Sequence, residues 1–167
     1  MQFILAFLQW IASTNASIFI KQSSWAFPAI ESLHVIALSL VVGTITIVDL
    51  RLLGLASTRR RYTSLSRAVL PWTWGAFATA AATGLVMFAS NPVGYFGNGD
   101  FRVKLLLILA AGCNMAIFQL FTVRTVSQWG GAARPPLSAK IAGAISLACW
   151  ISVVFFGRRI GFSMAFS

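Results

Sequence analysis

Four long apolar runs dominate this chain, and runs of this length constrain a fold more strongly than any short motif. Several approach the roughly 20 residues that a helix needs to cross the hydrocarbon core of a bilayer. The 167 residues are 58% hydrophobic and only 10% charged, with a mean hydropathy of +0.82. Because an ordinary soluble domain is about one-quarter charged, the composition predicts an integral membrane protein.

The apolar runs predict an all-α membrane protein, a four-transmembrane-helix bundle that forms a single domain over residues 1–167. The segments between them read "STRRRYTSLSR", "SNPVGYFGNGD" and "RTVSQWGGAARPP". Their glycine, proline, asparagine and serine residues are typical of loops, and none is long enough to separate two domains. The predicted helices cover residues 25–53, 69–89, 101–123 and 137–156.

Residues 1–20 predict an additional helix that lies in the outer interface of the membrane. Phe3, Phe7 and Ile11 share one helical face, as expected for an interfacial amphipathic helix. The segment lacks the basic start of a cleaved signal peptide. A fifth spanning helix is the alternative, but it would carry the polar cluster "STNAS" past its middle.

The net charge of +10 does not indicate nucleic-acid binding, because the basic residues lie between the apolar runs and not on one soluble face. Such residues predict topology signals and contacts with the anionic headgroups of the bilayer. The predicted cytoplasmic side carries eight of them and the other side five, which places both termini outside the cytoplasm in the inner membrane. The eight are Arg51, Arg59, Arg60, Arg61, Arg67, Arg124, Arg134 and Lys140, and the five are Lys21, Arg102, Lys104, Arg158 and Arg159.

Small residues recur every four positions in two of the predicted helices. In lipid, such residues let helix backbones approach closely and mark packing faces. The same faces would also serve a homo-oligomer or a larger membrane complex, and the pattern leaves this open. The two sets are Ala76, Ala80 and Gly84, and Ser138, Ala142 and Ser146.

Glu31, His34 and Asp49 are two of the three acidic residues and the only histidine, and all lie in the first apolar run. An ionisable group in hydrocarbon costs at least about 2.5–3.5 kcal/mol and normally faces the bundle interior or water. At about 100° per residue, Glu31 and Asp49 point the same way and His34 lies close to that line. The three residues therefore predict one stripe that faces the bundle.

The two ends of this stripe have different interpretations. Asp49 lies near the cytoplasmic end, where the nearby Arg51 favours a structural charge pair. Glu31 and His34 are three residues apart in the outer half, so their side chains meet on one helix face. Glu31 would orient the imidazole and leave its other nitrogen free for a metal or a proton. A neutral histidine bonded to Glu31 or to a carbonyl is the structural alternative.

Two kinds of cofactor suit an imidazole in this position. Soft ligands with imidazole bind copper, and Cys149 and Met87 are the candidates for a copper site with His34. Histidine, alone or with Met115, suits haem. Each methionine and cysteine has simple packing as its alternative. Four basic residues at the outer helix ends, Arg102, Lys104, Arg158 and Arg159, would face either haem propionates or lipid headgroups.

The spacing of His34, Gly43 and Arg51 resembles the first core helix of the copper-resistance D proteins and the HemJ-type protoporphyrinogen oxidases. The segment "FRVKLLLIL" resembles the start of a HemJ helix and places Lys104 on a matching position. The pattern, with "GRRIGF" near the end, is also similar to an uncharacterised bacterial family of small four-helix membrane proteins. The resemblance covers residues 28–160.

The resemblance implies a bundle in which His34 ligates b-type haem for membrane redox chemistry, with Lys104 as a second functional residue. The chain departs from the HemJ pattern at Asn114 and Met115, where those proteins carry a histidine. Without that histidine, one chain cannot bind haem iron through two histidines. The resemblance therefore does not support protoporphyrinogen oxidation for this chain. Ligation by Met115, a five-coordinate iron or no haem remain open.

Three functions follow from these patterns, and motifs of soluble enzymes such as G-x-S-x-G or a P-loop are absent. The leading hypothesis is a haem-binding redox protein centred on His34. The second is proton or copper transport along Glu31, His34 and Asp49. The third is a non-catalytic accessory subunit of a larger membrane complex.

Overall fold

A computed structural model describes residues 2–129, 131 and 135–165, and within them every regular element is a helix. Four helices are long and apolar enough to cross a membrane. This confirms the prediction of an all-α, multi-pass membrane protein. The four are α3 (Ala26–Leu53), α4 (Tyr62–Ser90), the Gly99–Thr122 span formed by α6 (Gly99–Ile117) and the π-helix η1 (Phe118–Thr122), and α8 (Leu137–Ala165).

Two of the spanning helices extend beyond the predicted bounds. α4 begins at Tyr62, seven residues before the predicted start at 69, and it includes Pro71 within the helix. α8 continues to Ala165, through "GRRIGF" and past the predicted end at 156. Hydropathy locates the part of a helix that lies in lipid, whereas the helix ends depend on capping groups and chain geometry.

Short capped elements join the long helices. Gly54 ends α3 in the left-handed conformation, with a φ of 77° that favours glycine. The predicted loop "SNPVGYFGNGD" contains α5 (Pro92–Gly97), for which Asn91 accepts a hydrogen bond from the Gly94 N–H. Asn98 caps α6 in the same way. Beyond η1, the chain continues through η2 (Val123–Thr125) and α7 (Val126–Trp129).

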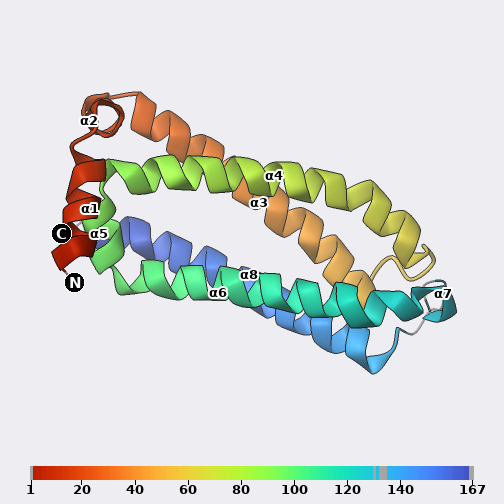
Figure 1. The fold of residues 1–167 in the computed structure, drawn as a ribbon. Coiled ribbons are helices and arrows are strands. Elements are labelled where there is room, and N and C mark those ends of the chain that lie inside the picture. Colours follow the sequence, from red (N-terminus) through yellow and green to blue (C-terminus); the bar gives the residue numbers. More distant parts are fainter. Residues whose placement is uncertain (1, 130, 132–134, 166–167) are drawn as a thin grey trace.

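Residues 1–20 form two helices and not the single predicted one. α1 (Gln2–Ala12) and α2 (Asn15–Gln22) meet at a bend of 64°. The break falls in the polar cluster, where the Thr14 side chain accepts a hydrogen bond from the Ser17 N–H and caps α2. Ser17 Oγ in turn donates to the Ala89 carbonyl at 2.7 Å, which fastens α2 to the end of α4. α1 lies across one end of the bundle (Figure 1), as expected of an interfacial helix.

The order of packing leaves one side of the bundle unclosed. α3 packs against α4 and α8, and α8 packs against α6. Within the described residues, α4 and α6 do not form an extensive packed interface of their own. Figure 1 shows α4 and α6 apart from each other, with α3 and α8 crossing behind them. The start of α1 and the end of α8 lie at the same end of the bundle, as four spans require.

Small residues occupy the tight helix contacts. Ala76 and Ala80 of the predicted α4 face are each 5% exposed. A Cβ added at Gly143 of α8 would lie 3.0 Å from the Asp49 carbonyl oxygen and 3.1 Å from Leu52 Cβ. This backbone approach brings α8 against the inner half of α3, and it therefore positions the Asp49 side of the bundle.

Candidate functional site

The predicted stripe on α3 divides into three different environments. Glu31 is exposed, His34 is half-buried and Asp49 is only 4% exposed. Fifteen residues separate His34 from Asp49, a rise of about 22 Å along the helix. They therefore belong to two sites, which we call the outer site, around His34, and the inner cavity, around Asp49.

Thr83 on α4 determines how the imidazole of the outer site is held. His34 Nδ1 lies 2.9 Å from Thr83 Oγ1. The Thr83 hydroxyl is 2.7 Å from the Thr79 carbonyl and donates its single hydrogen there. With its hydrogen on that carbonyl, Thr83 accepts from His34, an assignment that places the proton on Nδ1 and the lone pair on Nε2. That tautomer suits ligation or proton uptake through Nε2.

Gly84 provides the space in which the imidazole lies. A Cβ at this position would be 3.2 Å from His34 Cε1 and 3.7 Å from Nδ1. A Cβ at this distance would require the imidazole to shift slightly. The small residues of α4 were predicted to form a packing surface for another helix. One of them, Gly84, also lies against the His34 imidazole.

Lys104 joins the outer site from α6. Its side chain runs along α8, where a Cβ added at Gly157 would lie 3.6 Å from Nζ. Lys104 is close enough to His34 to interact with it electrostatically. Among the described residues, Lys104 forms no ion pair. The role of Lys104 as a second functional residue stays a prediction from the family resemblance.

Glu31 does not orient His34 as predicted. The side-chain partner of His34 within the described residues is Thr83, with the Ala80 backbone beside it, and Glu31 is exposed. Glu31 lies instead near Tyr95 of α5, where burial and the charge of Glu31 raise the pKa of the tyrosine hydroxyl. A carboxylate at the outer end of α3 gains more from solvent than from a buried position beside the imidazole.

The predicted soft ligands lie at different depths. Met115 follows Lys104 by eleven residues, about 16 Å further inward, and it lines the inner cavity. Cys149 precedes Gly157 by eight residues, about 12 Å, and is buried in the central core with Val41 and Val153. Neither residue reaches the level of Lys104, so neither serves as a second ligand beside His34.

Met87 is the one predicted soft ligand that remains near the outer site. It is half-buried on α4, four residues after Thr83 and therefore on the same helix face. Its role as a ligand stays a prediction. Among the described residues, no group of three or more histidine, cysteine, aspartate or glutamate side chains could hold a metal ion.

The basic residues at the outer end have partners of their own. Arg159 Nε lies 3.1 Å from Asp100 Oδ2, in an ion pair whose arginine side chain is 56% exposed. The Arg158 guanidinium lies 4.9 Å from the centre of the Phe162 ring. Contact with haem propionates would require these side chains to leave such partners, which leaves Lys104 as the better-placed cation. Arg134 of the predicted cytoplasmic set lies outside the described residues.

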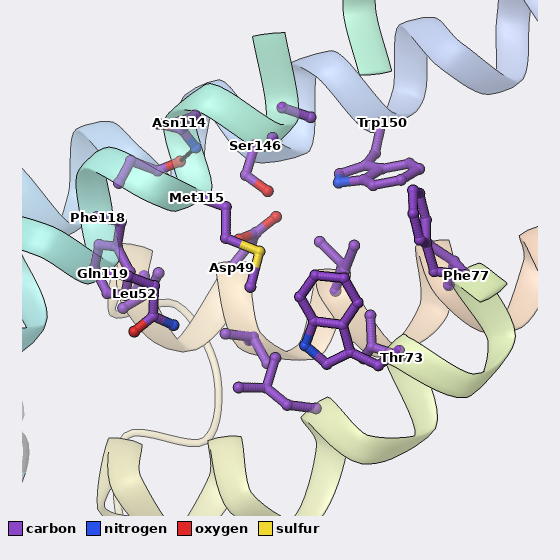
Figure 2. A pocket seen from close by; sticks show the side chains of 18 of the residues that line it. Asp49, Leu52, Thr73, Phe77, Asn114, Met115, Phe118, Gln119, Ser146 and Trp150 are labelled. Atoms are coloured by element: carbon purple, nitrogen blue, oxygen red, sulfur yellow. Dashed lines mark hydrogen bonds between the residues drawn. The ribbon is translucent and has the colours of Figure 1, made fainter. Parts of the chain in front are cut away.

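Asp49 and Arg51 do not form the predicted charge pair. Residues two apart on a helix point about 200° away from each other. Arg51 is completely buried and its Nε donates to the Arg60 carbonyl at 3.0 Å, towards the loop that follows α3. The Asp49 carboxylate points the other way, towards α6 and α8. The Ser146 side chain of α8 lies beside it (Figure 2).

The inner cavity was not predicted, because its walls come from all four long helices. Its volume is about 280 Å³. Figure 2 shows Asp49, Ser146, Met115 and Trp150 around the same space, with Phe77 beside Trp150. Aromatic residues that are far apart in the sequence, such as Phe77 and Trp150, meet here because α4 and α8 both pack against α3.

Comparison with protein-family models matches residues 5–163 to a family of unknown function (DUF6644). The match spans nearly the whole chain, including all four long helices, His34, Lys104 and Asp49. No curated protein and no solved structure matches the chain.

Proposed function

The chain belongs to this family of unknown function, and we propose that it is a small membrane redox protein that binds b-type haem through His34. The observation that carries the proposal is the 2.9 Å contact between His34 Nδ1 and Thr83 Oγ1. With the Thr83 hydroxyl donating to the Thr79 carbonyl, Nδ1 would donate to Thr83 and Nε2 would be free to bind iron. The family resemblance based on His34 and Lys104 points to the same cofactor.

The outer site contains side chains that would hold haem. His34 would bind the iron through Nε2, and Lys104 would neutralise a propionate, since this half-buried ammonium forms no ion pair within the described residues. Met115 and Cys149 lie further along their helices and line the inner cavity and the central core. Bound haem would supply one-electron chemistry, and the protein would supply the histidine ligand and the compensating charge.

The other functions receive less support from the arrangement. A path for protons or copper along α3 would have to cross the apolar core around Val41, which is fully buried, to join His34 to Asp49. Copper binding at His34 would depend on Met87 alone among the predicted soft ligands. No described contact favours an accessory subunit over a protein that acts alone.

Visible spectroscopy of the purified protein tests the proposal. The protein would be produced in haem-replete cells, purified in mild detergent and scanned in the oxidised and reduced states. We expect a Soret band that disappears in His34→Ala and persists in Asp49→Asn, the matched control in the inner cavity. A wild-type protein without a Soret band, or a band that survives His34→Ala, would contradict the proposal.

A further inference from the structure

Asp49 is the most unusual group in the inner half of the molecule. The residue is only 4% exposed, and its Oδ2 atom has no hydrogen-bond partner. Ser146 of α8 lies beside the Asp49 carboxylate. Within the described residues, no cation forms an ion pair with Asp49. A buried carboxylate that lacks a counter-charge costs several kcal/mol. It lies at the edge of a cavity (Figure 2), so a bound ligand could provide the missing partner.

The cavity walls near Asp49 are aromatic. Trp74 and Phe77 of α4 meet edge to face at a centroid distance of 6.1 Å, and Phe77 meets Trp150 of α8 in the same way at 6.4 Å. All three rings line the cavity, as does Tyr62. Aromatic faces attract organic cations, most strongly where water is excluded. A carboxylate with aromatic walls is therefore complementary to a positive charge carried on an apolar body.

The lining favours an organic cation over a metal ion. Calcium or magnesium needs about six oxygen ligands, mostly carboxylates and carbonyls, whereas the cavity offers one carboxylate among neutral and aromatic side chains. The described residues also hold no cluster of three or more metal-binding side chains. The volume of about 280 Å³ is near the lower limit of roughly 300 Å³ for small-molecule pockets, which favours a compact ligand.

Access to the cavity is lateral, from the lipid. Trp74 of α4 is 54% exposed and also lines the cavity. Gly112 of α6 is likewise exposed and lines it from the opposite side. Because α4 and α6 are not packed together along this side, the cavity opens between them. An amphiphilic cation that partitions into the bilayer would reach Asp49 by this route.

A local irregularity of the backbone supports a ligand site here. The regular α-helix of α6 gives way to the π-helix η1 at Phe118, and the first two residues of η1, Phe118 and Gln119, line the cavity. π-helical turns inside α-helices occur frequently at functional sites, where they redirect side chains. We propose that the inner cavity binds a small hydrophobic monocation, a quaternary ammonium or a protonated amine, with Asp49 as its counter-ion.

A pair of probes of the same shape isolates the role of the charge. Benzyltrimethylammonium carries the cation, and neopentylbenzene replaces its nitrogen with carbon. Binding would be measured by equilibrium dialysis against the protein in lipid nanodiscs, with empty nanodiscs subtracted. We expect the wild type to prefer the cation by about tenfold or more, a difference of roughly 1.4 kcal/mol. We expect Asp49→Asn to lose that preference while it keeps its affinity for the neutral probe.

Two control variants keep the test decisive. Asp100→Asn removes a carboxylate outside the cavity and should leave the preference unchanged. A Cβ at Gly112 would meet no atom within 4 Å, so we expect Gly112→Leu to fold. Its side chain should occupy part of the cavity and weaken the binding of both probes. Gly75→Leu is its matched control, because Gly75 is equally open but does not line the cavity.

The outcomes separate this proposal from the haem proposal. Equal affinity for the two probes in the wild type would identify an apolar occupant such as a lipid chain and would overturn the proposal. Cation binding that Asp49→Asn leaves intact would also overturn it. If Asp49→Asn does not fold, Gly112→Leu decides, because cation binding that survives in it cannot involve the cavity. The Soret band reports on the outer site, so either proposal can fail alone.

Discussion

The outer site and the inner cavity lie on the same helix but have opposite electrostatic character. Around His34, the neighbouring charge is the ammonium of Lys104, and no carboxylate is paired with either residue in the described part of the chain. Around Asp49, the charge is a single carboxylate with aromatic walls. The first arrangement suits an anionic group on a ligand and the second suits a cationic one. The helix α3 thus carries two candidate binding sites of opposite charge preference, about 22 Å apart.

This difference arises from the partners that α3 meets along its length. Gly84 of α4 leaves space for the imidazole, and Thr83 forms a hydrogen bond with its Nδ1 atom. Further inward, close contact with α8 at Gly143 brings Ser146 to Asp49, while α4 and α6 remain apart. The comparison predicts that changes at one level leave ligand binding at the other level intact.

The largest effect is expected from Gly143→Val, which breaks the close approach of α3 and α8. The new side chain would overlap the Asp49 carbonyl region, where even a Cβ lies at 3.0 Å. We expect a loss of about 3 kcal/mol in the free energy of unfolding, measured by denaturant titration in detergent micelles. Cation binding should be lost while any Soret band persists. Loss of both together would mean that the two levels are not independent.

The control for this experiment is Gly161→Val on the same helix. A Cβ at Gly161 meets no atom within 4 Å. This variant should therefore cost less than about 1 kcal/mol. A cost as large as that of Gly143→Val would show that valine in α8, and not the contact with α3, destabilises the protein.

Ser146→Ala removes the hydroxyl that faces Asp49 in the inner cavity. Because hydrogen bonds to charged groups contribute about 1.5–3 kcal/mol, we expect the ligand-free protein to lose about 1.5 kcal/mol of unfolding free energy. Ser39→Ala is the control, since Ser39 is exposed and bonds only to Val35 of its own helix. Added benzyltrimethylammonium should restore more stability to Ser146→Ala than to Ser39→Ala. Equal costs for the two variants would argue against the contact with Asp49.

Thr83→Val tests the outer site by removing the acceptor of the His34 Nδ1 proton. Interhelical hydrogen bonds in membranes contribute about 0.6–1 kcal/mol, so the expected loss of unfolding free energy is about 1 kcal/mol. The orientation of His34 should also relax, which would shift the Soret maximum and the midpoint potential of bound haem. Thr79→Val keeps the imidazole contact and is the control. Haem spectra that are identical in wild type and Thr83→Val would contradict a role of Thr83 in fixing the tautomer.

The smallest effect is expected at the outer rim, from Asp100→Asn. In the Asp100–Arg159 ion pair, the arginine side chain is more than half exposed. Such surface pairs contribute about 0.2–1 kcal/mol and are screened by salt. We expect a loss of about 0.5 kcal/mol that vanishes at high ionic strength, with haem and cation binding both unchanged. A change in either binding constant would place this pair within one of the two sites.

Several features of the fold could be read from the order of residues. Four apolar runs predicted the four spans, since the requirement to match a bilayer acts on each helix separately. The polar cluster "STNAS" signalled the break between α1 and α2, although the prediction kept one helix there. Helix ends were less accurate because hydropathy reports burial in lipid and not capping. The role of Lys104 stays a prediction, because it came from a resemblance and not from its contacts.

Side-chain partners could not be predicted in this way. Helical periodicity placed Glu31, His34 and Asp49 on one stripe, but it could not show that Glu31 turns outward or that Thr83 accepts from His34. The pairing of Asp49 with Arg51 was plausible from their proximity in the chain. It fails because residues two apart point in nearly opposite directions, and their partners come from other helices.

The sequence by itself determined the all-α membrane class, the positions of the four long apolar helices and the polar residues that these helices carry. Those properties depend on local composition and periodicity, which each segment contains on its own. Only the tertiary structure decided which side chains His34 and Asp49 meet, and that a cavity lies among the four long helices beside Asp49. The reason is that helices in lipid pack through shape and small residues rather than through hydrophobicity. Which helices meet, and at what depth, is therefore a property of the whole bundle.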